Sequence, residues 1–229
     1  MFRLPPLVLA GLTGFLSGLL LSIPVGPVNL TIINEGARRG FRWAALIGLG
    51  ATAMEVLYCA VAFTGFASFF SQGYIKAAME LFSFVFMLYL AAKFLSAKSV
   101  TATTKISAVT SRLEATLEER LHPRSAFMTG FARVMGNPGV LLWWIILAAN
   151  FISREWVEPN GQGKIACIAG VAVGVGLWFV GLSWAVSLGH RKFGEETLLR
   201  MEHWSGGVLL ALALAHGGTL VWQLGHHKM

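Results

Sequence analysis

Charged side chains are scarce in this sequence of 229 residues, of which 13% are charged and 55% hydrophobic. The apolar residues come in runs of about 20 rather than in stripes along one helix face, and runs of that length match the hydrocarbon core of a bilayer. This pattern excludes an ordinary soluble domain and predicts an all-α integral membrane protein. The six expected spans are residues 7–34, 43–66, 77–95, 126–151, 165–188 and about 198–222.

Cysteine is also scarce, with only Cys59 and Cys167 in the whole chain. Two cysteines in two different expected spans suggest neither a disulfide framework nor a zinc site, so we expect them to pack in apolar surroundings. The first apolar run lacks the small-x-small cleavage site of a signal peptide and continues to a basic stop at Arg38 and Arg39. It is therefore expected to be the first span.

Positive charge exceeds negative charge by a formal +7. In a soluble protein this excess would suggest a nucleic-acid partner, but here the basic residues gather on the connections after the first, third and fifth expected spans. The positive-inside rule makes that side cytoplasmic and places both termini outside. The charge is therefore explained by membrane topology, and no nucleic-acid partner is expected.

The longest connection, residues 97–123, divides the chain into two halves, 1–96 and 124–229. It begins with AKSVTATTKISAVTS, which cannot bury enough apolar surface to order itself, and continues with RLEATLEERL, which has the pattern of a short amphipathic helix. Each half holds three expected spans. An odd number of spans per half gives the halves opposite orientations, so the sequence predicts two inverted three-helix repeats.

Prolines interrupt the first and fourth expected spans. The first interruption is SIPVGPVN, with Pro24 and Pro27, and the second is GNPG, with Pro138. Proline lacks a backbone N–H and clashes with the carbonyl four residues earlier, so both spans are expected to be broken helices. Each break follows a glycine, Gly18 or Gly130, by eight or nine residues, which supports the repeat.

The two breaks and a carboxylate are expected near the middle of the membrane. Gly26, Glu55 and Gly136 each lie about twelve residues from a cytoplasmic end, or roughly 18 Å at the helical rise per residue. Unpaired backbone groups are tolerated at this depth only where they line a cavity or are buried in protein. Paired breaks therefore predict the central site of a transporter. The alternative is a pair of packing kinks satisfied by neighbouring Ser or Thr hydroxyls.

Glu55 lies at the centre of ALIGLGATAMEVLYCAVAFTGF. An ionised carboxylate there is costly unless it is paired, protonated or hydrated. Helical spacing puts Gly48, Thr52, Glu55 and Cys59 on one face, which is expected to look into the bundle. A role for Glu55 in proton coupling or substrate binding is favoured, with a structural ion pair or an interfacial position as alternatives.

Three further polar residues lie close to the breaks. Arg133 precedes the second break and either snorkels to the interface, binds a substrate carboxylate or pairs with Glu55. Asn29 and Asn137 carry amides that both donate and accept hydrogen bonds, which suits a zwitterionic substrate.

Small residues form seams on two spans. Gly11, Gly14 and Gly18 follow one face of the first span, and Gly170 and Gly174 lie four residues apart on the fifth. Such seams predict close helix packing, with homodimerisation as an alternative use.

The segment PVGPVNLTIINEGARRGFRWAALIGLGATAMEVLYCAVAFTGF resembles the opening of LysE/RhtB-type amino-acid exporters, and GFARVMGNPGVLLWW resembles their second motif. This resemblance implies an inner-membrane exporter made of two inverted three-helix repeats and driven by the proton motive force. The sequence departs from the family pattern at Glu55, where an aspartate is expected, and Arg133 is not part of that pattern.

These observations predict a secondary transporter that exports amino acids or similar small zwitterions by proton antiport, without a cofactor. Glu55 is expected to bind an amino group or the coupling proton, and Arg133 to meet a carboxylate. The residues expected to shape the site are Gly26, Pro27, Asn29, Asn137 and Pro138. Alternatives are an exporter of metal or other inorganic cations and a non-transporting scaffold. An enzyme is not expected, because few catalytic groups converge at depth.

Overall fold

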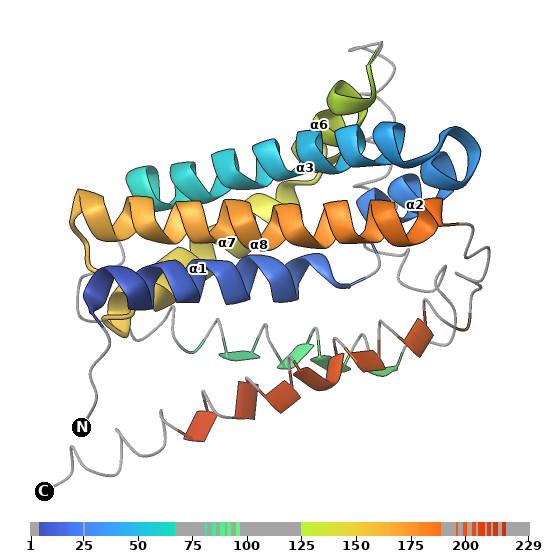
Figure 1. Cartoon of the computed structure of the whole chain (residues 1–229). Coiled ribbons are helices and arrows are strands. Elements are labelled where there is room, and N and C mark those ends of the chain that lie inside the picture. Colours follow the sequence, from blue (N-terminus) through green and yellow to red (C-terminus); the bar gives the residue numbers. More distant parts are fainter. Residues whose placement is uncertain are drawn as a thin grey trace, which may run out of the picture.

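The computed structural model describes residues 5–24, 26–66 and 125–188, together with scattered positions within 81–96 and 196–218. The third and sixth expected spans fall mostly outside these residues, as does the whole expected linker 97–123. The helices of the described part are α1 (Pro6–Ser22), α2 (Pro27–Arg39), α3 (Phe41–Val61), the π-helical turn η1 (Ala62–Phe66), α6 (Ala126–Met135), α7 (Pro138–Ser153) and α8 (Gly161–Ser187) (Figure 1).

Two described helices are long and apolar enough to cross a membrane, namely Phe41–Gly65 and Gly161–Ser187. The pairs α1 with α2 and α6 with α7 pass the same test only together, and they bend by 70° and 67° at their breaks. The described residues therefore supply two spans, or up to four if each bent pair is one span. The chain is an all-α multi-pass membrane protein, and both predicted helix breaks are present.

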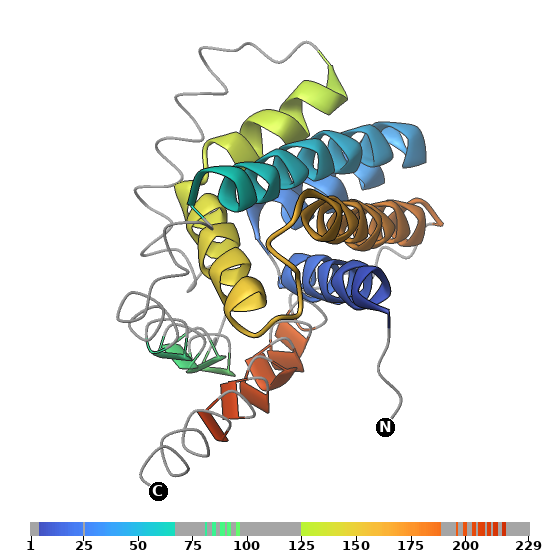
Figure 2. The ribbon, with the colours of Figure 1, turned by 90° about the vertical axis from the view of Figure 1, so that its left-hand side faces the viewer.

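The helices α1, α8, α3 and α6 lie side by side in that order, as Figure 2 shows in a view nearly along α1 and α8. The broken spans thus contribute the two outer helices of the row, and the unbroken helices form its centre. Gly11 lies against Ala166 and Gly18 against Val171, so α1 and α8 run in the same direction. Gly48 instead lies against Phe179, while Thr52 lies against the earlier residue Gly176, so α3 and α8 are antiparallel.

Glycines allow the backbones of α1 and α8 to touch. A Cβ atom added at Gly14 would overlap the carbonyl group of Cys167, and one added at Gly170 would overlap the carbonyl oxygen of Gly11. A Cβ at Gly174 would overlap the carbonyl oxygen of Phe15 in the same way. The predicted small-residue seams are therefore confirmed as sites of close packing, and they face each other within one chain.

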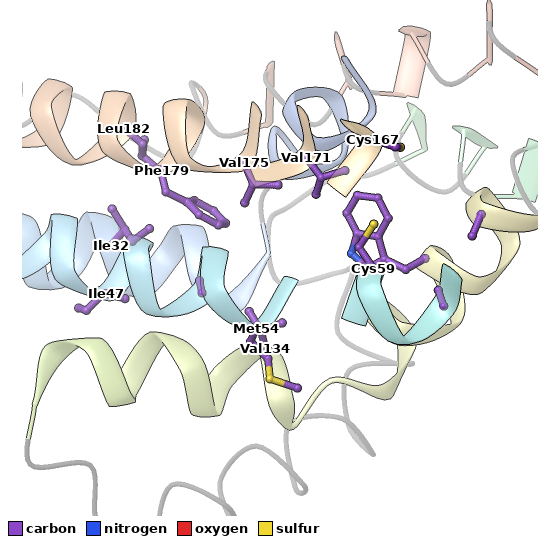
Figure 3. Close-up of a cluster of buried hydrophobic side chains, with 14 of the residues drawn as sticks. Ile32, Ile47, Met54, Cys59, Val134, Cys167, Val171, Val175, Phe179 and Leu182 are labelled. Atoms are coloured by element: carbon purple, nitrogen blue, oxygen red, sulfur yellow. The ribbon is translucent and has the colours of Figure 1, made fainter. Parts of the chain in front are cut away.

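The contact between α6 and α3 has the same character. A Cβ at Gly130 would overlap the carbonyl oxygen of Ile47, and a Cβ at Gly50 would overlap that of Phe127. Apolar side chains fill the rest of the core, in which Met54 of α3, Val134 of α6 and Phe179 of α8 are buried (Figure 3).

The predicted inward face of the second span is also confirmed. Gly48, Thr52 and Cys59 are buried and Glu55 is half-buried, whereas Leu57 on the opposite face is exposed. The predicted apolar packing of the cysteines is also confirmed, because both Cys59 and Cys167 are fully buried among apolar side chains.

Candidate functional site at the two helix breaks

The first break separates α1 from α2 between Ser22 and Pro27. Pro27 is the first residue of α2, where the missing N–H of proline costs no helical hydrogen bond. The Asn29 side chain then turns back across the break. Its Nδ2 donates to the carbonyl oxygens of Ser22 at 2.9 Å and Pro24 at 2.7 Å, and its Oδ1 accepts the indole N–H of Trp178 at 3.1 Å.

These three bonds occupy both amide protons and the amide oxygen of Asn29, which is 3% exposed. The carbonyls of Ser22 and Pro24 are therefore satisfied by protein. The nearby hydroxyls of Ser22 and Thr31 donate within their own helices, to Gly18 and Pro27. In this conformation Asn29 holds the shape of the break.

The second break is closed in a different way. The Asn137 side chain does not reach back across the break but accepts the N–H of Gly139 at 3.1 Å, so it caps the start of α7. Pro138 is the first residue of α7. The carbonyl oxygen of Met135, the last residue of α6, accepts the hydroxyl of Tyr58 from α3 at 2.9 Å.

Glu55 lies one turn before Tyr58 on α3 and reaches the other side of the same break. Its Oε2 accepts the indole N–H of Trp144 on α7 at 2.6 Å, and Trp144 is only 1% exposed. Since Tyr58 holds the end of α6 and Glu55 holds α7, one face of α3 contacts both sides of the second break. The structure thus places Glu55 against α7 at Trp144, six residues after Pro138.

Arg133 and Gly26 occupy separate places around the breaks. Arg133 is half-buried in the last turn of α6, one turn before Asn137. Among the described residues, the hydrogen bond of the Glu55 carboxylate is with Trp144, and no ion pair joins Glu55 to Arg133. Gly26 caps α2 at the first break, and a Cβ added there would meet no atom within 4 Å.

The two breaks lie on either side of the contact between the unbroken helices. Trp178 of α8 reaches the first break, Glu55 of α3 reaches the second, and Thr52 meets Gly176 between them. In the part of the chain that the structure describes, no group of three His, Cys, Asp or Glu side chains gathers where it could hold a metal ion. Among the described residues, the ionisable side chains close to the second break are thus the carboxylate of Glu55 and the guanidinium of Arg133.

Trp144, Trp178 and Tyr58 were not identified as site residues by the sequence analysis. Tryptophan and tyrosine in a membrane protein are typical of interfaces, and eight tryptophans gave no reason to single out two. The available signal was depth, because a buried indole N–H in the middle of a span has to find an acceptor. Which acceptor it finds depends on the rotation of each helix, which the sequence leaves open.

Tyr58→Phe is expected to lower the free energy of unfolding by about 1–2 kcal/mol, because it leaves the carbonyl of Met135 without a donor. The measurement is the thermal unfolding of purified protein in detergent. Thr64→Val is the control, since the exposed Thr64 hydroxyl bonds only within its own helical segment and its loss should cost less than about 0.5 kcal/mol. Equal losses in the two variants would contradict a special role for the bond to Met135.

Comparison with known proteins shows the family of this chain. A family model described as "LysE type translocator" matches residues 19–216. A curated relative is the Bacillus subtilis (strain 168) protein named "Putative amino acid efflux protein YcgF", which is 26% identical over 209 residues, covering 90% of this chain and 94% of the relative. No solved structure matches the chain. Since the family match includes both breaks and both unbroken helices, the chain belongs to the LysE type translocator family and is a transporter rather than an enzyme.

Proposed function

We propose that this translocator exports amino acids or similar small zwitterions across the bacterial inner membrane by proton antiport. The observation that carries the proposal is the Glu55 carboxylate, which lies against a broken helix in the interior of a transporter. Charged groups at such depth are rare and usually serve substrate binding or proton transfer. The name of the B. subtilis relative, an amino acid efflux protein, favours a substrate with an amino and a carboxyl group.

In this proposal Glu55 binds the amino group of the substrate and the coupling proton in turn, and Arg133 binds the substrate carboxylate. Glu55 contacts α7 and Arg133 lies in the last turn of α6, so the two side chains come from the two sides of the second break. Gly26, which caps α2 at the first break, is proposed to line the site on that side. The other residues proposed to shape the site are Pro27, Asn29, Asn137 and Pro138.

The packing of the described helices supports two inverted repeats. Gly18 and Gly130 precede Pro27 and Pro138 by nine and eight residues, and each packs on an unbroken helix against two residues spaced by four. Those contact residues are Val171 and Val175 on α8 and Ile47 and Ala51 on α3. A two-fold axis between α8 and α3 would exchange these two contacts, and it would exchange the two ends of the row α1, α8, α3 and α6 (Figure 2).

Helix direction supports the proposed six spans. Along α3, Ile47 lies against Gly130 and Tyr58 bonds Met135, so α3 and α6 are parallel. The chain between two parallel spans has to recross the membrane, which fits a third span at 77–95. The exposed Arg38 and Arg39 at the end of α2 fit a cytoplasmic turn, with both termini outside.

The test is efflux of a panel of labelled amino acids from cells or vesicles that contain wild type, Glu55→Gln or Glu158→Gln. We expect at least one amino acid to leave faster with wild type, and we expect Glu55→Gln or collapse of the proton gradient to abolish that difference. Glu158→Gln is the control because Glu158 is exposed outside the helices and should leave efflux unchanged. If a folded, inserted wild type moves no amino acid with the gradient intact, amino-acid export is wrong.

A further inference from the structure

Each half-helix that follows a break is tied to an unbroken helix by one indole N–H. Trp178 of α8 donates to Asn29 of α2 at 3.1 Å, and Trp144 of α7 donates to Glu55 of α3 at 2.6 Å. The two ties therefore join α2 to α8 and α7 to α3, which are equivalent helix pairs in the proposed repeat.

The acceptors of the two ties differ in what can happen to their charge. The Asn29 amide is neutral in every state of the protein. The Glu55 carboxylate loses its negative charge when it takes up a proton and has that charge neutralised when it pairs with an ammonium group. Hydrogen bonds to a charged acceptor are roughly twice as strong as those between neutral groups. The tie on α7 therefore weakens when Glu55 is loaded, while the tie on α2 does not change.

The two breaks also differ in how their two sides are joined. Asn29 belongs to α2 and bonds two carbonyls at the end of α1, so its side chain joins the two sides of the first break directly. At the second break, the end of α6 is bonded by Tyr58 and α7 is bonded by Glu55, both from α3. The Trp144 tie can therefore open without disturbing the bond between Tyr58 and Met135.

We propose that α7 is the half-helix that moves during transport, that α2 stays fixed, and that the Trp144–Glu55 hydrogen bond is the latch on α7. Trp144 is a positioning residue, whose N–H competes with the proton or the substrate amino group for the Glu55 carboxylate. The inference rests on the proposed role of Glu55 as the proton and amino-group site. It adds that loading of Glu55 releases α7 at the second break, whereas the first break is unaffected.

The test is hydrogen–deuterium exchange of the full-length protein in lipid nanodiscs without substrate, comparing wild type, Trp144→Phe, Trp178→Phe and Glu55→Gln. In Trp144→Phe, backbone exchange within α7 should rise about tenfold or more while exchange within α2 is unchanged. Trp178→Phe should give the reverse pattern. Glu55→Gln keeps an acceptor oxygen but removes the charge, so exchange within α7 should rise by about threefold to tenfold.

Glu55→Gln is the decisive variant, because a purely structural bond would survive removal of the charge. Wild-type exchange within α7 in this variant would overturn the proposal, and so would equal loosening of α7 by Trp178→Phe. If Trp144→Phe fails to insert into the membrane, Glu55→Gln and Trp178→Phe still show whether exchange within α7 depends on the charge of Glu55. This experiment measures exchange and not transport. Its result can therefore be interpreted even if the protein exports no amino acid.

Discussion

Asn29→Asp is expected to leave little folded protein, although aspartate has nearly the shape of asparagine. The substitution removes both donors from the carbonyls of Ser22 and Pro24 and places a carboxylate oxygen where the amide nitrogen lay, 2.9 Å and 2.7 Å from them. The Ser22 carbonyl is buried and that of Pro24 is partly buried. A buried acceptor without a donor costs about 1–3 kcal/mol. A charge at a side chain that is 3% exposed adds a further desolvation penalty.

The matched control is Asn137→Asp at the other break. Asn137 uses its side-chain oxygen to accept the N–H of Gly139, and aspartate caps a helix as well as asparagine does. Because Asn137 is half-buried and no backbone acceptor loses its donor, we expect this variant to lose much less stability than Asn29→Asp. The measurement is the monodisperse fraction after purification in detergent, followed by thermal unfolding. Similar losses at the two positions would show that the first break is not held by the donors of Asn29.

The contrast between these two asparagines shows where prediction from the sequence ends. Proline chemistry is local, so Pro27 and Pro138 predicted both breaks, and helical spacing predicted the buried face around Glu55. In the sequence, Asn29 and Asn137 are alike, since each lies within two residues of a proline in a broken span. Their opposite roles depend on which backbone groups each amide meets, and those contacts are set by tertiary packing.

The same limit applies to contacts between helices. The spacing of Gly14 and Gly18 predicted a seam on the first span, but nothing in that spacing indicated α8 as the partner. Trp144 and Trp178 were equally hidden, because the rotation of α7 and α8 decides whether an indole N–H points to lipid or to Glu55 and Asn29. The sequence therefore predicts positions along each helix better than it predicts the neighbours of those positions.

Gly14→Ala is expected to prevent α1 from packing on α8, although it adds only one methyl group. The new Cβ would overlap the backbone carbonyl of Cys167, which cannot turn away as the end of a side chain could. The helices would have to separate, with a cost of about 1–3 kcal/mol or more for overpacking a close contact. We expect a lower monodisperse fraction and a lower unfolding temperature in detergent.

Gly11→Ala on the same helix is the control, because its Cβ would lie 3.7 Å from the carbonyl oxygen of Ala166, an ordinary contact distance. Since alanine also favours the helix over glycine, this variant should equal wild type or gain up to about 1 kcal/mol. If Gly11→Ala is as damaging as Gly14→Ala, the damage does not arise from the overlap with Cys167.

Gly130→Ala tests the close contact between α6 and α3, at the other end of the row of helices. Its Cβ would overlap the carbonyl oxygen of Ile47 on α3, as that of Gly14 overlaps Cys167 on α8. In the proposed inverted repeat the position equivalent to Gly130 is Gly18, whose added Cβ would lie 2.9 Å from the carbonyl oxygen of Val171 on α8. Gly18→Ala and Gly130→Ala each open a broken span from the unbroken span beside it, so both should destabilise the protein. Loss of stability in only one of these two variants would mean that the two contacts are not equivalent, and the repeat would then lose its main structural support.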